Sequence, residues 1–200
     1  MGLLFHYQEL EERYDQWATE YDADLENSFV WLAPKMVADV FAEHVKPTAH
    51  VLDAGAGTGM SGEALAELGF NNIVAMDLSQ GMLDEAKNKN VYVAFDQMAL
   101  GGDLAYETDS FDGVVLVGVF TLGHAPASSL DELIRVTKPG GCIAFSIRVD
   151  MTQGGDEFPA KFASLEKAGK WKLAKTTEPY KPLPKGEPDV FHQVWAFQVA

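Results

Sequence analysis

Three glycines, Gly55, Gly57 and Gly59, stand at alternate positions directly after the mostly apolar run at residues 51–54. A helix-compatible stretch at residues 60–68 follows them, so the pattern predicts a strand, a glycine turn and a helix. Glycine at such a turn can adopt a positive φ and lets a ligand approach bare backbone. The first turn of the helix leaves N–H groups unpaired, and these can bind an anionic group. We therefore predict that this turn binds a ligand.

Asp77 follows a second apolar run, residues 73–76, and is predicted to lie at the tip of the second strand. An acid in that place can accept hydrogen bonds from both hydroxyls of a ribose. The glycine turn and Asp77 together predict a site for a nucleoside cofactor. Asp77 argues against the alternative, a glycine-rich turn that binds nothing.

Two kinds of nucleoside cofactor suit these residues. Residues 57–62 match the pattern G-x-G-x-x-G, and Asp77 lies at about the spacing of a dinucleotide fingerprint. However, Asp53 precedes the first glycine by two positions, where its charge would repel a pyrophosphate and attract an ammonium group. The sequence also lacks a recognisable Tyr-x-x-x-Lys pair for hydride transfer. A cofactor with a cationic group is favoured, and an NAD(P)-binding oxidoreductase stays an alternative.

The motif Asp-Ala-Gly-Ala-Gly-Thr-Gly at residues 53–59 resembles the first motif of class I S-adenosylmethionine-dependent methyltransferases. Residues 109–112 and 135–141 add independent agreement with that family. Residues 117–126 and 165–171 resemble one subgroup more closely, the methyltransferase-like proteins of the Williams–Beuren region. The resemblance implies S-adenosylmethionine as cofactor, with S-adenosylhomocysteine as product.

The resemblance also implies a set of cofactor contacts. Asp53 would meet the amino group, directly or through water, and Asp77 would bind the ribose hydroxyls. Val119 would help to enclose the methionine portion at the end of the fourth strand. The remaining implied contacts are Gly55, Ala56, Gly57, Thr58, Gly59, Leu78, Met82, Leu100, Gly101, Val117 and Gly118.

The adenine contact departs from the family pattern. Many relatives place an Asp after the third strand, and here that position falls near Leu100 and Gly101. The adenine would then meet Leu100 by packing and the backbone N–H of Gly101. Asp96 and Asp103 are the alternatives.

Residues 6–27 carry a helical stripe of aromatic side chains: Tyr7, Tyr14, Trp17 and Tyr21. One interpretation is an amphipathic helix packed on the core. Residues 14–22 also resemble the segment that forms a lid over cofactor and substrate in many small-molecule methyltransferases. We place Tyr14 and Tyr21 near the sulfonium, because an aromatic face attracts a cation.

Strand-like runs alternate with helix-like stretches, which predicts a parallel sheet covered on both faces. The last two runs have no helix between them and should form a hairpin. We therefore predict one α/β domain, residues 1–200, with a lid helix at about 6–27 and a core at about 34–200. The resemblance implies the Rossmann-like class I methyltransferase fold, a seven-stranded, mostly parallel sheet whose last strand is antiparallel. The seven runs are 50–54, 73–77, 91–95, 111–117, 142–149, 171–176 and 191–199.

Local signals predict several helix ends and turns. Pro34 suits the first turn of a helix at 34–45, and Ser79 can cap a helix that runs to about Lys89. Residues 129–132 match a capping box that would open a helix to Thr137. A turn at residues 138–141 should lead into the fifth strand. The last helix, 157–168, should end at Gly169. The proline-rich residues 177–189 predict a surface loop or a rim over the substrate pocket, with Tyr180 as a candidate substrate contact.

The amino-acid composition limits the classes of partner that this protein is expected to bind. The chain has 15 basic and 30 acidic residues and a formal net charge of −15, so we expect neither nucleic acid nor a membrane as partner. Its single cysteine, Cys142, excludes an intramolecular disulfide and a cysteine-based metal site, and we expect no metal. No apolar stretch approaches the about 18 residues of a membrane span, and the acidic N-terminal region is unlike a signal peptide. We therefore expect a cytoplasmic protein.

His124 is the candidate catalytic residue, in the loop after the fourth strand. It could serve as a base, bind the substrate by a hydrogen bond, or be structural. The predicted function is methyl transfer to a small-molecule acceptor by in-line displacement, with a protein acceptor less favoured because no added recognition domain is evident. A non-catalytic cofactor-binding or protein-interaction module is the alternative. The sequence leaves open the acceptor, the methylated atom and the oligomeric state.

Overall fold

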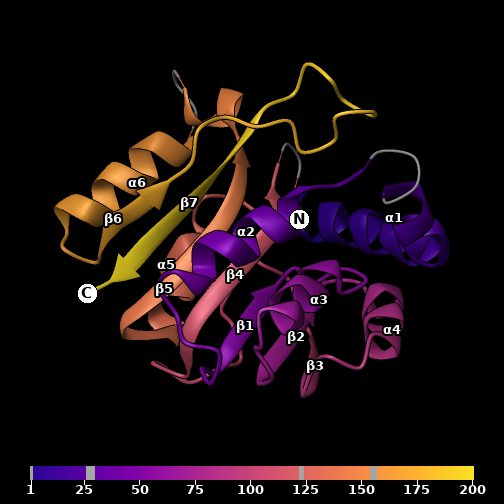
Figure 1. The fold of residues 1–200 in the computed structure, drawn as a ribbon, viewed down its shortest axis with the longest axis horizontal. Coiled ribbons are helices and arrows are strands. Elements are labelled where there is room, and N and C mark those ends of the chain that lie inside the picture. The colour runs from indigo at the N-terminus through magenta and orange to yellow at the C-terminus, as the bar shows by residue number, and fades with distance from the viewer. Residues whose placement is uncertain (1, 26–29, 122–123, 154–156) are drawn as a thin grey trace.

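The computed structural model describes residues 2–25, 30–121, 124–153 and 157–200, with side chains from residue 7 onward. A seven-stranded sheet forms the centre, in the order β3-β2-β1-β4-β5-β7-β6 (Figure 1). Strands β1 to β5 run parallel to one another, and β7 is antiparallel to both β5 and β6. The strands are β1 Val51–Ala54, β2 Ile73–Asp77, β3 Ala94–Gln97, β4 Phe111–Phe120, β5 Thr137–Arg148, β6 Trp171–Thr176 and β7 His192–Val199. The predicted sheet with its antiparallel last strand and its final hairpin is confirmed.

Helices cover both faces of the sheet, as predicted (Figure 1). Side chains of α2 and α3 pack with one set of strand residues, and those of α5 and α6 pack with the set that faces the other way. Helix α4 packs on β2 and β3, and α1 packs mainly on α4, with a hydrogen bond from Gln97 of β3 to Glu11 at 2.9 Å. The helices are α1 Gly2–Ala23, α2 Ala33–Ala42, α3 Met60–Glu67, α4 Gln80–Asn88, α5 Ser129–Val136 and α6 Glu157–Lys167, with a short 3-10 helix at Val149–Thr152.

Some predicted boundaries were wrong. Strand β3 begins at Ala94, β4 continues to Phe120, and α2 ends at Ala42. Strand β5 already begins at Thr137, so the predicted turn at residues 138–141 lies within it. The pairing of β4 with β5 is irregular there. Phe111 pairs with Thr137 and Gly113 pairs with Cys142, so β5 has more residues than β4 between these two pairs.

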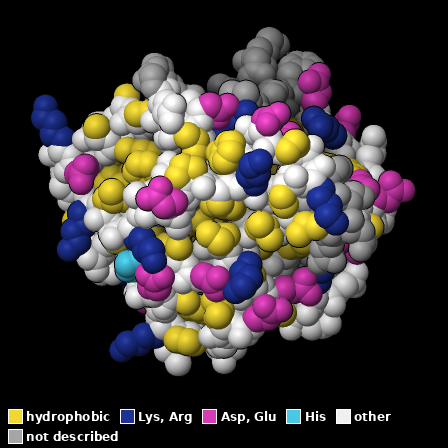
Figure 2. Space-filling view, turned by 45° about the horizontal axis from the view of Figure 1, so that its top comes forward, with side chains coloured by type: hydrophobic (Ala, Val, Ile, Leu, Met, Phe, Trp, Pro, Cys, Tyr) yellow, Lys and Arg dark blue, Asp and Glu magenta, His cyan; other side chains and the backbone are white. Residues whose placement is uncertain are grey.

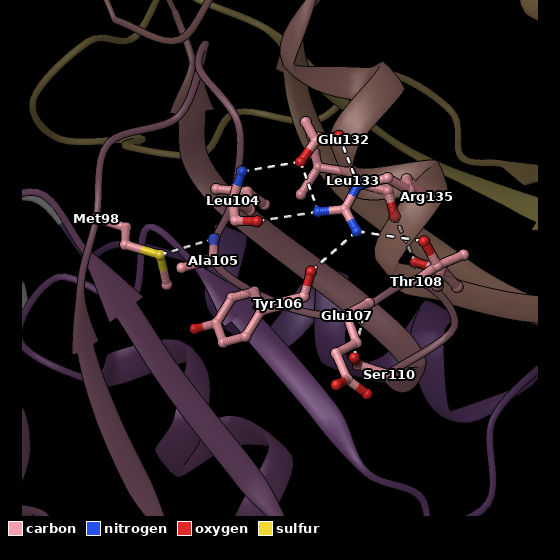
Figure 3. Close-up of polar contacts among 11 residues, drawn as sticks. Met98, Leu104, Ala105, Tyr106, Glu107, Thr108, Ser110, Glu132, Leu133 and Arg135 are labelled. Carbon is pink, nitrogen blue, oxygen red and sulfur yellow. Dashed lines mark hydrogen bonds and ion pairs between the residues drawn. The ribbon is translucent and has the colours of Figure 1, made fainter.

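The predicted capping box at the start of α5 is also wrong, whereas the predicted cap of α4 by Ser79 is confirmed by a 3.0 Å bond from the N–H of Met82. The hydroxyl of Ser129 is buried without a hydrogen-bond partner within the described part of the chain. Glu132 instead accepts from the N–H of Leu104 at 2.8 Å and forms an ion pair with Arg135 at 2.6 Å (Figure 3). The side chain of Glu132, which the local pattern assigned to the cap of α5, therefore takes part in a hydrogen-bond network with Leu104 and Arg135 instead.

Arg135 fixes the segment that connects β3 with β4 (Figure 3). Its guanidinium donates to the carbonyls of Leu104 at 3.0 Å and Tyr106 at 2.9 Å, and to both carboxylate oxygens of Glu132. These bonds satisfy backbone carbonyls in a connection that has no helix.

Two surface observations complete the description. None of the described helices is long and apolar enough to cross a bilayer. On the face shown in Figure 2, basic side chains stand singly among acidic and hydrophobic ones.

Candidate functional site

A cavity of about 100 Å³ lies at the ends of strands β1 to β4. Its walls come from the residues that follow these strands and from the inner side of α1. This volume is below the about 300–1,000 Å³ of typical ligand pockets. The residues around it are Tyr7, Leu10, Tyr14, Tyr21, Gly55, Gly57, Met76, Asp77, Leu78, Met82, Met98, Ala99, Leu100, Val117, Gly118, Val119, His124 and Ala125.

The glycine turn forms one wall. Gly55 and Gly57 line the cavity, and both adopt positive φ, 85° and 54°. A Cβ on Gly57 would meet nothing within 4 Å, whereas one on Gly55 would lie 2.3 Å from the side chain of Val119. The backbone of Gly57 is therefore accessible to a ligand, and the missing side chain of Gly55 allows Val119 of β4 to approach the turn.

Three predicted residues of this turn do not line the cavity: Ala56, Thr58 and Gly59. Ala56 is buried, and the Thr58 hydroxyl donates to Asp22 of α1. Gly59 starts α3 in the left-handed region, with φ 95°.

Asp77 lies at the cavity, where it was predicted. One carboxylate oxygen accepts from the N–H of Gly57 at 2.8 Å, and the other accepts from the N–H of Ser79 at 2.9 Å. Burial raises the pKa of Asp77, and the backbone hydrogen bonds oppose that rise because they stabilise the charged form. The structure also places Leu78 and Met82 at the cavity.

Asp53 lies behind this wall. Its side chain is fully buried and does not line the cavity. Oδ2 accepts from the hydroxyls of Ser61 at 2.6 Å and Tyr92 at 2.7 Å. Burial raises the pKa of Asp53 to about 6.

The aromatic stripe of α1 faces the cavity. Tyr7, Tyr14 and Tyr21 all contribute to its lining, while Trp17 meets Tyr21 edge to face and donates to Asp24 at 2.8 Å. Burial raises the pKa of Tyr14 and Tyr21 above the ordinary tyrosine value, so both hydroxyls stay protonated.

Acidic side chains hold α1 in this position. Asp15 accepts from the Ser79 hydroxyl at 2.5 Å and from the N–H of Gly81 at 2.9 Å, both at the start of α4. Asp22 forms an ion pair with Lys89 at 2.7 Å, besides its bond to the glycine turn. The helix is thus attached to the same segments that line the cavity. Residues 26 and 27 of the predicted lid lie outside the described residues.

The end of β4 forms the opposite wall. Val117, Gly118 and Val119 line the cavity, and the N–H of Gly118 donates to the hydroxyl of Ser146 at 3.0 Å. His124 joins them, with its Nε2 2.8 Å from the Tyr14 hydroxyl. Gly123, which precedes His124 in this loop, lies outside the described residues.

The structure places one of the two predicted adenine contacts at the cavity. Leu100 lines the cavity, and Gly101 does not. The Tyr7 hydroxyl donates to the carbonyl of Leu100 at 2.8 Å. Of the alternatives, Asp96 accepts from Tyr106 at 2.9 Å and Asp103 is exposed, and neither lines the cavity.

Sequence reasoning missed several contributors. The cavity residues Leu10, Met76, Met98, Ala99 and Ala125 carry no motif, and only their positions next to strand ends or on the stripe of α1 could have indicated them. No group of three or more potential metal-ligating side chains occurs in the described part of the chain.

Known proteins share this architecture. The methyltransferase domain family matches residues 52–145. Methyltransferase-like protein 27 of Homo sapiens is 32% identical over 164 residues, which are 79% of this chain and 66% of that protein. A demethylmenaquinone methyltransferase of Clavibacter sepedonicus is 34% identical over 142 residues, 68% of this chain and 54% of that protein. The chain thus spans less than two thirds of the length of either relative.

Among solved structures, the complex of DhpI with S-adenosylhomocysteine superposes with a TM-score of 0.65 at 18% identity and covers 97% of both chains. The fold is therefore that of the Rossmann-like methyltransferases. With the glycine turn and the sequence relatives, it defines the chain as a member of the class I S-adenosylmethionine-dependent methyltransferase family. Membership in this family indicates S-adenosylmethionine as the cofactor.

Proposed function

We propose that this protein transfers a methyl group from S-adenosylmethionine to a small-molecule acceptor. The observation that carries the proposal is one cavity in which the open backbone of Gly57, the carboxylate of Asp77 and the tyrosines of α1 meet. The demethylmenaquinone methyltransferase among the relatives supports a small acceptor.

The residues suit the cofactor. Asp77 keeps lone pairs beyond its two backbone hydrogen bonds, and these would take the ribose hydroxyls. Tyr14 and Tyr21 would face the sulfonium, and Gly118 and Val119 would enclose the methionine portion. Met82 and Leu100 would pack on the adenine.

The bound cofactor supplies an activated methyl group on a good leaving group. The protein then has to orient the acceptor in line and exclude water. Helix α1 would exclude water, because its tyrosines form one side of the cavity. His124 would take a proton from an acceptor hydroxyl or amine.

Two other functions compete with this proposal. A non-catalytic member of the same fold would bind the cofactor without turnover. An NAD(P)-binding oxidoreductase would use Gly62 as the last glycine of its fingerprint. However, an ideal Cβ on Gly62 would lie 2.2 Å from the ring of Tyr92, so packing alone accounts for glycine at this position.

Two measurements separate the candidates. Isothermal titration calorimetry should show binding of S-adenosylhomocysteine and no binding of NAD or NADP. A library screen that scores S-adenosylhomocysteine release should then find a small acceptor. Cofactor binding without any turnover would favour the non-catalytic module, and NAD binding would contradict the proposal.

A further inference from the structure

Tyr92 lies just before β3, away from the cavity lining, and contacts both Asp53 and the start of α3. Its hydroxyl donates to Oδ2 of Asp53 at 2.7 Å and accepts from the N–H of Gly62 at 3.1 Å. Its ring lies so close to Gly62 and Gly59 that ideal Cβ atoms there would come within 2.2 Å and 3.0 Å of it. The missing side chains at these two glycines therefore make room for Tyr92.

Asp53 has one unused acceptor. Ser61 and Tyr92 donate to the same oxygen, Oδ2, whereas Oδ1 is buried without a hydrogen-bond partner in the portion of the chain that is described. A buried carboxylate oxygen without a donor is costly, so Oδ1 is available to a donor that the protein itself does not supply. Asp77, which lines the cavity, is close enough for its charge to act on Asp53.

We propose that Tyr92 is a positioning residue for the cofactor: with Ser61 it holds Oδ2 of Asp53, which leaves Oδ1 to accept from the ammonium group of S-adenosylmethionine, directly or through water. This proposal rests on the proposed function. Tyr92 lies outside the glycine motif at residues 53–59, so the motif alone assigns it no role.

The same hydrogen bonds set the charge of Asp53. Burial raises its pKa, and so does the nearby charge of Asp77 on β2, while the bonds from Ser61 on α3 and from Tyr92 lower it. Removal of the Tyr92 hydroxyl should therefore raise the pKa of Asp53 further. Asp53 then loses its charge at a higher pH, and with it the attraction for an ammonium group.

The test is the variant Tyr92→Phe, which keeps the ring against Gly59 and Gly62. Calorimetry between pH 5.5 and 8 would use three ligands: S-adenosylhomocysteine, its decarboxylated analogue, and 5′-methylthioadenosine, which lacks the ammonium group. At pH 7 we expect about two- to tenfold weaker binding of the first two, from the smaller ionised fraction of Asp53. Binding of 5′-methylthioadenosine should not change. The acid loss of S-adenosylhomocysteine affinity should begin at a higher pH in the variant.

Tyr106→Phe is the matched control, because it removes a hydroxyl that donates to Asp96 at 2.9 Å outside the cavity. It should leave all three affinities unchanged, and melting curves would verify that both variants fold. Equal weakening of all three ligands by Tyr92→Phe would show a merely structural role and overturn the proposal. Unchanged affinity for every ligand would overturn it as well. If the unmodified protein binds none of the three, the proposed function itself fails, whatever the variant does.

Discussion

The hydroxyl of Tyr14 and Nε2 of His124 lie 2.8 Å apart, although 110 positions separate them in the sequence. Their rings meet edge to face, with centroids 5.8 Å apart. This contact joins α1 to the loop that leaves β4. If His124 is the proposed base, an acceptor that gives its proton to Nε2 would first have to displace the Tyr14 hydroxyl, and acceptor binding would then be coupled to the position of α1.

The first prediction concerns His124. His124→Ala should keep the affinity for S-adenosylhomocysteine and lower kcat by about 10²–10⁴-fold, the usual contribution of a general base. The remaining rate should lose the pH inflection that the general base produces. The assay is S-adenosylhomocysteine release with the acceptor that the screen finds. An unchanged kcat and pH profile would exclude the base, and weaker cofactor binding would assign His124 to the shape of the cavity.

The second prediction concerns Asp77. Asp77→Ala removes the predicted acceptor of the ribose hydroxyls and should weaken S-adenosylhomocysteine binding by about 1–3 kcal/mol, the scale of hydrogen bonds to a charged group. Calorimetry measures this, and a melting curve verifies the fold because the N–H groups of Gly57 and Ser79 also lose their acceptor. Asp84→Ala, on the exposed side of α4, is the control and should bind normally. Normal affinity in folded Asp77→Ala would remove the ribose assignment.

The third prediction concerns α1 as a lid. Deletion of residues 1–25 should leave the sheet folded, because α1 packs mainly on α4 and its hydrogen bond to β3, between Gln97 and Glu11, is exposed. Activity and the protection of bound cofactor should be lost, because the deletion takes away Tyr7, Tyr14 and Tyr21. Circular dichroism and calorimetry distinguish the outcomes.

A subtler variant tests the attachment of this helix. Asp22→Ala breaks the ion pair with Lys89 and the bond to Thr58, and should speed the dissociation of S-adenosylhomocysteine. Glu20→Ala, exposed on the same helix, should not. If the truncated protein unfolds, α1 is part of the core and the lid hypothesis fails.

The fourth prediction concerns stability. Arg135→Gln leaves the carbonyls of Leu104 and Tyr106 without their donor and should lower the free energy of unfolding by about 1–2 kcal/mol. Lys35→Gln, which breaks the exposed ion pair with Asp39, should cost less than about 1 kcal/mol. Urea unfolding measures both.

The difference in the free energy of unfolding between the unmodified protein and Arg135→Gln should depend on pH through the protonation of Glu132. Arg135 lowers the pKa of Glu132 below its ordinary value of 4.5, so the stabilisation is fully present above pH 4.5. It is lost as the pH falls through the lower pKa of the folded state. The gap between the unmodified protein and Arg135→Gln should therefore narrow in acid, and a gap that widens would contradict this account.

Local sequence signals predicted the glycine turn, Asp77 and the cap at Ser79 because each depends on neighbours in the chain. The position of Tyr92 beside Asp53 could not be predicted, since it depends on how the start of α3 packs beside the segment before β3. Asp15 contacts the start of α4 from another helix, which no local pattern encodes. The capping box failed for the same reason, because Glu132 bonds to Leu104 and Arg135 instead.

The position of β7 between β5 and β6 has a consequence for how the chain folds. The strand that comes last in the sequence is not an edge strand, so β6 can join the sheet only through residues that follow it. We therefore expect this side of the sheet to form late, since the pairing of β5 and β6 with β7 requires His192–Val199. A chain that lacks His192–Val199 would leave β5 paired with β4 alone and β6 without its partner strand, and both would be open to pairing with other chains.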